Sequence, residues 1–291
     1  MPFMRYTATG GAFVLSVKTR DLQVVAGLAA TVVLISFAAR LLLPQGWWMI
    51  ALVASLCAIM LVQLDTYRRL QSMLREIHDD PGQNYRQVEA LFSLFALLPV
   101  KAALPPMRGA AISPDLAAQL ASIILRERPR TVLELGSGAS TIVGGYALRA
   151  SGQGRLVSCD ESSEYAGYAR ARIALHGLED IVTIRHAPLQ PTRLPGGEYH
   201  WYDQGACDLE QGIDLLIVDG PLQMGRSGEP VRYPALPLLA NRLSRRCVVL
   251  IDDCHRPQEK QMVERWLREF PDFTAERTSG EKQHVILRRV R

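Results

Sequence analysis

Short apolar runs that alternate with helical patterns constrain the fold of residues 108–291 more than any other feature of the sequence. These runs lie at residues 131–135, 156–159, 181–185, 213–218, 247–251 and 284–288. Strands without polar alternation are buried on both faces, as in parallel sheets whose connections are helices. We therefore predict an α/β domain built on a doubly wound, mostly parallel sheet that helices cover on both faces.

The first strand leads into the sequence ELGSGAST at residues 134–141. Gly136 and Gly138 allow close backbone approach, and the helix that follows offers free N–H groups to an anion. A dinucleotide-binding fingerprint would need glycine at position 141, where this chain has threonine. Glu134 is poorly placed beside a pyrophosphate. The pattern indicates a ligand that carries both an ammonium group and a carboxylate.

Further acidic residues follow the other strands. Asp160 and Glu161 end the second strand, where an acid can bind both hydroxyls of a ribose. Asp219 follows residues 213–218, and the run IDDCH at 251–255 places Asp252, Asp253 and His255 after the next strand. Because carboxyl ends of parallel strands share one edge, these side chains are expected to face one cleft. Helix capping by the aspartates, turn formation at Asp219 and a loop role for His255 remain alternatives.

The order and spacing of ELGSGAST, VSCDES, DLLIVDGP, RYPALPLL and VVLIDDCH resemble class I S-adenosylmethionine (SAM)-dependent methyltransferases over about residues 108–289. Within that superfamily the chain looks like the small-molecule and sugar O-methyltransferase branch, which implies a Rossmann-like fold with a seven-stranded sheet. The resemblance implies that SAM is held by Glu134, Gly136, Ser137, Gly138, Ser140, Thr141, Asp160, Glu161, Ala187 and Asp219. The expected reaction is O-methylation of a sugar, a lipid-linked compound or another small molecule.

A hydroxyl acceptor must lose its proton to a base, or to a site where a metal lowers its pKa. Asp219, Asp252 and His255 are the predicted catalytic residues. A Mg²⁺ ion held by Asp219, Asp252 and Asp253 is one hypothesis, because the pattern resembles metal-dependent catechol and macrolide-sugar O-methyltransferases. A metal-free site with Asp219 or His255 as the base is the other, and the sequence leaves both open.

The stretch from residue 22 to 64 is almost free of charge. Two runs, 22–43 and 47–64, each come close to the roughly 20 residues that span a membrane, and Pro44 and Gly46 separate them. Arginine and lysine lie outside both runs, apart from Arg40 near the end of the first, which predicts that both chain ends are cytoplasmic. We therefore expect a transmembrane hairpin in the inner (cytoplasmic) membrane, with the catalytic domain on the cytoplasmic side. A signal peptide and a buried soluble hairpin are the alternatives.

The predicted domains are a cytoplasmic segment at 1–21, the hairpin at 22–64, a helical linker at 65–107 and the methyltransferase domain at 108–291. A break is expected at residues 79–82, and the apolar stripe before it leaves homodimerisation open. A net charge of +4 gives no reason to expect nucleic acid as a partner. Rival functions are aminopropyl transfer on the same fold, an inactive membrane scaffold and a nicotinamide oxidoreductase.

Overall fold

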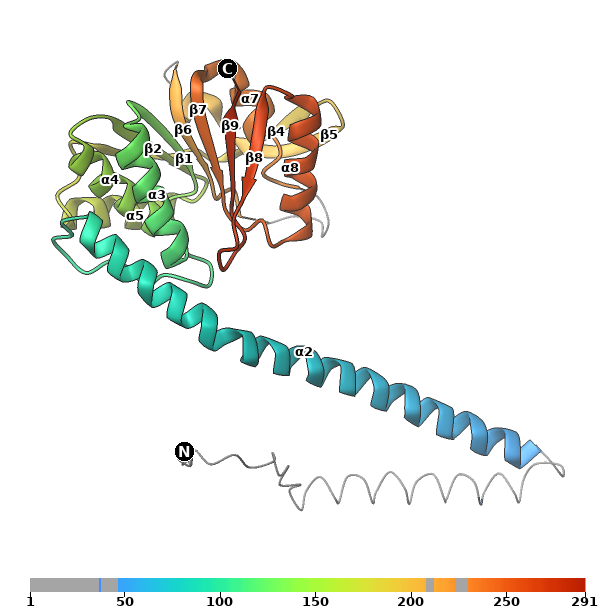
Figure 1. Cartoon of the computed structure of the whole chain (residues 1–291). Coiled ribbons are helices and arrows are strands. Elements are labelled where there is room, and N and C mark those ends of the chain that lie inside the picture. The colour runs from blue at the N-terminus through green and yellow to red at the C-terminus, as the bar shows by residue number, and fades with distance from the viewer. Residues whose placement is uncertain (1–36, 38–46, 208–211, 223–229, 291) are drawn as a thin grey trace, which may run out of the picture. The chain divides into compact units, whose positions relative to one another are not determined.

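A computed structural model of the chain describes residue 37 and residues 47–207, 212–222 and 230–290 (Figure 1). The chain divides into two compact units, with the boundary between Asp79 and Asp80. The second unit holds the sheet and all of the predicted site residues.

Helix α2 runs without interruption from Trp47 to Leu97. The helix break predicted at residues 79–82 is therefore wrong. Proline removes one backbone hydrogen bond from a helix and usually kinks it. Here the turns before and after Pro81 and Gly82 are both helical, so the two residues do not end the element.

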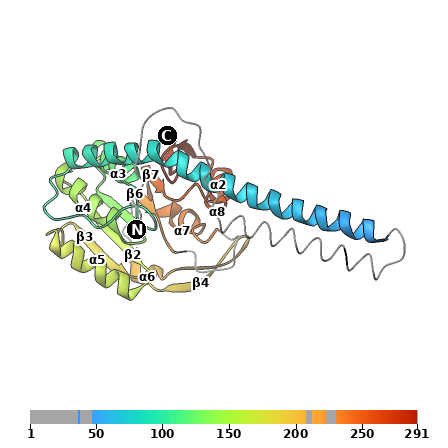
Figure 2. The ribbon, with the colours of Figure 1, turned by 90° about the horizontal axis from the view of Figure 1, so that it is seen from below.

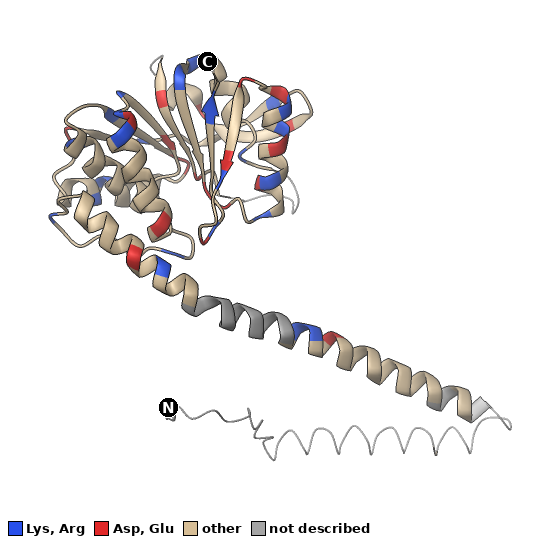
Figure 3. Ribbon diagram, viewed as in Figure 1, with Lys and Arg blue, Asp and Glu red and all other residues tan. Residues whose placement is uncertain are grey.

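The second predicted membrane span, residues 47–64, is the uncharged first part of α2, and charged side chains begin at Asp65 (Figure 3). The apolar run is thus not a helix of its own, because α2 continues directly into Arg68 and Arg69. Among the residues that the structure describes, no helix combines the length and the apolar character needed to cross a membrane. This finding contradicts the predicted membrane location and gives the predicted transmembrane hairpin no support. Apart from Phe37, residues 22–43 lie outside the described residues.

The seven-stranded sheet has the strand order β3-β2-β1-β6-β7-β9-β8. Five strands pair in parallel, and β9 pairs antiparallel with both β7 and β8 at one edge. This confirms the predicted mostly parallel sheet. The strands are β1 Thr131–Leu135, β2 Arg155–Asp160, β3 Val182–His186, β6 Ile213–Val218, β7 Leu243–Ile251, β8 Phe273–Arg277 and β9 Val285–Arg289. Because β2 and β6 flank β1, the strand order reverses at β1, which is where open α/β sheets bind ligands.

Helices cover both faces of this sheet (Figures 1 and 2). The first set is α3 Pro114–Glu127, α4 Ala139–Ser151 and α5 Ser163–Leu175, and the second is α7 Ala235–Leu239 and α8 Pro257–Glu269. Two neighbouring side chains of β1 pack on opposite faces of the sheet. Val132 lies in the core formed with α3, α4 and α5, and Leu133 lies in the core formed with α7 and α8. The sheet is therefore doubly wound, as predicted.

The last part of α2 belongs to the second unit. Leu94 and Leu98 are buried in the core that also holds α3 and α4. The side-chain carbonyl of Gln87 accepts a hydrogen bond of 3.1 Å from the backbone N–H of Asp115. These contacts join the end of α2 to the rest of the second unit.

Three smaller elements complete the described fold. A hairpin of β4 (Leu189–Leu194) and β5 (Gly197–Tyr202) follows β3, and the short helix α6 (Gln204–Cys207) comes next. The 3-10 helix η1 (Ala240–Arg242) joins α7 to β7. The hairpin delivers Trp201 and Tyr202 to the second core.

Candidate active site

A cavity of about 360 Å³ opens at the carboxyl ends of β1, β2, β6 and β7. It brings together most of the predicted site residues. Those that line it are Gly136, Ser137, Gly138, Ser140, Asp160, Glu161, Asp219 and Asp253. Glu134, Thr141, Ala187, Asp252 and His255 are not part of its lining.

The glycine-rich loop after β1 is held against the end of β6. Gly136 has a φ of +95°, and a Cβ atom there would lie 3.0 Å from the backbone nitrogen of Gly220. Glycine is thus required at 136 by the backbone of the protein itself. Gly138 is the N-cap of α4 and has no side chain to cap the first turn. The N–H groups of that turn remain available to an anion.

Glu134 lies beneath the loop and is wholly buried. Thr141 Oγ1 donates a hydrogen bond of 2.5 Å to Glu134 Oε2, and accepts one of 2.9 Å from the Gly138 N–H. Glu134 Oε1 has no hydrogen-bond partner among the described residues. Burial raises the pKa of Glu134 to about 7, against the opposing effect of the Thr141 hydrogen bond. The carboxyl group fixes the first turn of α4.

Asp160 connects the glycine-rich loop to the end of β2 through hydrogen bonds. Its carboxylate accepts hydrogen bonds from the backbone N–H of Ser137 at 3.0 Å and of Ser162 at 2.9 Å. The N-cap of α5 is Ser162, whose hydroxyl accepts from the N–H of Tyr165. Asp160 therefore shapes the cavity rather than capping the helix.

Glu161 connects the same edge to two other segments. It accepts a hydrogen bond of 3.1 Å from the hydroxyl of Tyr202 and one of 3.0 Å from the backbone N–H of Leu222. The side chain thus links the end of β2 to the β4–β5 hairpin and to the segment after β6. Tyr202 lies in the hairpin, outside every motif quoted from the sequence.

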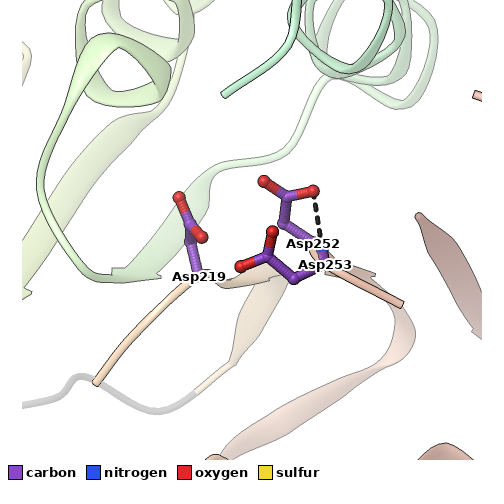
Figure 4. A group of neighbouring side chains, drawn as sticks. All are labelled: Asp219, Asp252 and Asp253. Atoms are coloured by element: carbon purple, nitrogen blue, oxygen red, sulfur yellow. Dashed lines mark hydrogen bonds between the residues drawn. The ribbon is translucent and has the colours of Figure 1, made fainter. Parts of the chain in front are cut away.

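Asp219 at the end of β6 lies beside Asp252 and Asp253 at the end of β7 (Figure 4). One carboxylate oxygen from each lies within 4.8 Å of the others, and we call these three residues the acid cluster. The Asp219 side chain is 20% exposed, whereas those of Asp252 and Asp253 are almost fully buried. Burial and then the charge of Asp252 raise the pKa of Asp219 to about 7, although Arg232 opposes this.

Three cationic side chains that sequence reasoning missed surround the acid cluster: Arg232, Arg256 and Lys282. Arg232 lies within the quoted sequence RYPALPLL, but that motif carried no sign of an ion pair. His255 is exposed, and its backbone N–H donates to the carbonyl of Lys282 at 3.0 Å. Its predicted role as a base stays a prediction.

Comparison with known proteins identifies the domain that carries this site. Residues 133–254 match a family model described as a methyltransferase domain. This stretch runs from β1 to the end of the acid cluster, so it contains most of the predicted cofactor and catalytic residues. No curated protein matches the chain.

Solved structures similar to this chain include three methyltransferases. An O-methyltransferase from Bacillus cereus in complex with SAH (S-adenosylhomocysteine) is 24% identical, with a TM-score of 0.47. The match covers 70% of this chain and 90% of that chain. TomG from Streptomyces achromogenes, an O-methyltransferase in complex with SAM, is 18% identical, with a TM-score of 0.46. The match covers 70% of this chain and 89% of that chain. SAH-bound PaMTH1, a methyltransferase from Podospora anserina, is 16% identical, with a TM-score of 0.48. The match covers 70% of this chain and 88% of that chain.

The match to the methyltransferase domain agrees with the acidic strand ends and the glycine-rich turn that the second unit presents to one cavity. Residues 133–254 carry the sequence pattern of a methyltransferase domain, and this match identifies the chain as a SAM-dependent methyltransferase.

Proposed function

We propose that this enzyme transfers the methyl group of SAM to a hydroxyl group of a small-molecule acceptor, with Asp219 as the proton acceptor. One observation above all supports the proposal: a single cavity joins the glycine-rich loop to Asp219. Gly136, Ser137 and Gly138 line the cavity at the loop, and the partly exposed carboxylate of Asp219 lines it at the end of β6.

The residues of the loop fit SAM by their chemistry. The uncapped first turn of α4 suits the carboxylate of the methionine part. Glu134 lies beneath this loop, outside the lining of the cavity, and its carboxyl group supports the first turn of α4 through Thr141. Asp160 and Glu161 line the cavity at the end of β2, where acids serve as ribose ligands. We therefore propose that both carboxylates bind the ribose in addition to the hydrogen bonds that they accept within the protein.

SAM supplies an activated methyl group on a positively charged sulfur. The acceptor oxygen attacks the methyl carbon, the C–O bond forms as the C–S bond breaks, and the electron pair of that bond stays on sulfur as SAH. The proton of the hydroxyl passes to the carboxylate of Asp219. A carboxylate whose pKa is raised toward 7 is a stronger base than an ordinary aspartate, and it is still ionised to a large extent at neutral pH.

The remaining lining of the cavity is mostly apolar or aromatic and includes Pro105, Ile112, Tyr165, Tyr168 and Leu222. Such surfaces favour a ligand with an apolar or aromatic body over a free sugar, because burial of apolar area drives binding. We therefore propose a hydroxyl compound of that kind as the acceptor.

Calorimetric titration of the full chain with SAM, SAH, decarboxylated SAM and NAD tests the cofactor part. We expect SAM and SAH to bind, and NAD to give no heat. SAH formation is then measured over a panel of phenols, alcohols and sugars. Turnover with SAM in none of these classes, together with aminopropyl transfer from decarboxylated SAM, would contradict O-methylation.

The variant Asp219→Asn tests the base. We expect it to keep SAH affinity and to lose about 10²–10⁴-fold in kcat, the usual contribution of general base catalysis. Asp180→Asn, on an exposed side chain that pairs with Arg149, is the matched control. If Asp219→Asn turns over like wild type, Asp219 is not the base. This result would not contradict SAM binding.

A further inference from the structure

The acid cluster is the place where the sequence predicts a Mg²⁺ ion. Three carboxylate oxygens within 4.8 Å of one another are a donor set that Mg²⁺ accepts. Whether the ion fits depends on the other charges at the site. These come from the segment before α7, from the start of α8 and from the β8–β9 connection.

Arg232 contacts two of the three carboxylates of the acid cluster. Its guanidinium Nη2 lies 3.4 Å from Asp219 Oδ1 and 3.1 Å from Asp253 Oδ2, and its Nη1 donates to the backbone carbonyl of Asp252 at 3.3 Å. The side chain is only 2% exposed. Burial disfavours the charged guanidinium, but Asp219 and Asp253 outweigh it and raise the pKa of Arg232. One buried cation therefore already bridges the two strand ends.

Lys282 and Arg256 complete the charge balance. Lys282 Nζ lies 3.4 Å from Asp252 Oδ2 and 3.5 Å from Asp253 Oδ1, and it also donates to the carbonyl of Ala111 at 2.9 Å. Arg256 Nη1 lies 3.0 Å from Asp253 Oδ2. Three carboxylates thus face three cationic side chains. Asp253 Oδ1 accepts no hydrogen bond from the described residues, but the Lys282 ammonium group balances its charge.

A Mg²⁺ ion does not fit this arrangement. It needs nearly octahedral oxygen ligands at roughly 2.0–2.1 Å, with the charge of the ion balanced by its ligands. Here the guanidinium of Arg232 lies between two of the carboxylates, and Asp252 Oδ1 already accepts a hydrogen bond of 2.7 Å from the Asp253 N–H. An added divalent ion would face three positive side chains within a few ångströms of its ligands.

We infer that Arg232 is a built-in cation that takes the place of a divalent metal ion at the acid cluster, and that methyl transfer by this enzyme needs no metal. The inference rests on the proposed function, because it concerns the same site. Arg232 lines the cavity beside Asp219. It acts as a positioning residue that holds the Asp219 carboxylate at the cavity wall by an ion pair with one of its two oxygens.

Manganese is the probe for the test, because free and bound Mn²⁺ are distinguished by electron paramagnetic resonance. The full-length wild-type chain, treated with EDTA and then freed of it, is titrated with Mn²⁺, and we expect no stoichiometric binding. Arg232→Met leaves the carboxylates without the cation that contacts two of them, so Mn²⁺ binding should tighten by about tenfold or more. Arg232→Lys keeps the positive charge and is the matched control, expected to behave like wild type.

Wild-type protein that binds one Mn²⁺ ion, with the ion lost in Asp253→Asn, would overturn the inference. This titration decides the question even if Arg232→Met does not fold. SAH is titrated into the same samples. Absence of SAH binding contradicts the proposed function, whereas Mn²⁺ binding with normal SAH affinity contradicts only the role of Arg232.

Discussion

Gly136 shows how one residue serves the cofactor site through the protein's own backbone. Its φ is positive, and a side chain has no room there because its Cβ atom would lie 3.0 Å from Gly220 N. We predict that Gly136→Val lowers the melting temperature and abolishes SAH binding. An L-residue in this conformation costs about 1–2 kcal/mol even before the steric overlap is counted. Calorimetry and thermal unfolding measure both effects.

Gly138→Ala is the matched control for this prediction. A Cβ atom at Gly138 would meet no atom closer than Ser140 Oγ at 3.9 Å, and the φ of −174° is open to any residue. The variant should therefore unfold at the wild-type temperature. Gly136→Val that binds SAH and unfolds like wild type would show that the loop relaxes away from Gly220.

Glu134 gives a prediction on stability against pH. Burial raises its pKa from an ordinary value of 4.5 to about 7 in the folded chain. Between these values the unfolded chain has released the proton and the folded chain still holds it, so stability falls as the pH rises. The contribution is fully present below about pH 4.5 and is lost as the pH rises through about 7, by at most about 3 kcal/mol.

The variant Glu134→Gln isolates this effect, because other groups such as Asp219 titrate in the same range. Urea unfolding of both proteins at pH 5, 6, 7 and 8 gives the difference in free energy of unfolding. We expect wild type to lose stability relative to Glu134→Gln across this range. Parallel pH profiles for the two proteins would mean that Glu134 has an ordinary pKa in the folded state.

The parallel strands are the elements that sequence predicts well. Residues 131–135 and 213–218 coincide with β1 and β6, because an apolar run followed by a glycine or an acid fixes both the strand and its end. The β4–β5 hairpin and β8 were not predicted. Their exposed polar residues resemble loops, and β4 even contains Pro191, so only tertiary contacts define them.

The candidate site also has residues that the sequence predicts and residues that it does not. Acids at strand ends are local features, and their meeting in one cleft follows from the parallel sheet. The partners of those acids are not local: Arg232 and Lys282 lie 13 and 30 residues away from Asp219 and Asp252 in the chain. Lys282 lies in no motif, and RYPALPLL gives no sign that Arg232 forms an ion pair, so the sequence left the metal hypothesis open.

The end of α2 is an element whose packing is tested by one substitution. Leu94 is fully buried in the core shared with α3 and α4, whereas Leu97 on the same helix is 39% exposed. Leu94→Ala should lower the free energy of unfolding by about 2–5 kcal/mol, the usual cost of a cavity left by a buried leucine.

Leu97→Ala is the matched control, expected to cost less than about 1 kcal/mol because the side chain already meets water. Urea unfolding of the two variants compares them directly. Equal effects would mean that residues 80–97 do not pack on the core of the catalytic unit.

At the scale of the whole molecule, we propose that the unit from residue 80 to 291 folds and binds SAM without the preceding residues. It contains the complete sheet, the cavity and the buried leucines of α2. A chain starting at residue 80 should therefore bind SAH with the affinity of the full protein. A chain starting at residue 108 lacks Leu94, Leu98 and the Gln87 hydrogen bond, so it should be destabilised by several kcal/mol. Calorimetry with SAH and thermal unfolding of the three chains compare them, and a residue-80 chain that neither folds nor binds would place part of the folding core before Asp80.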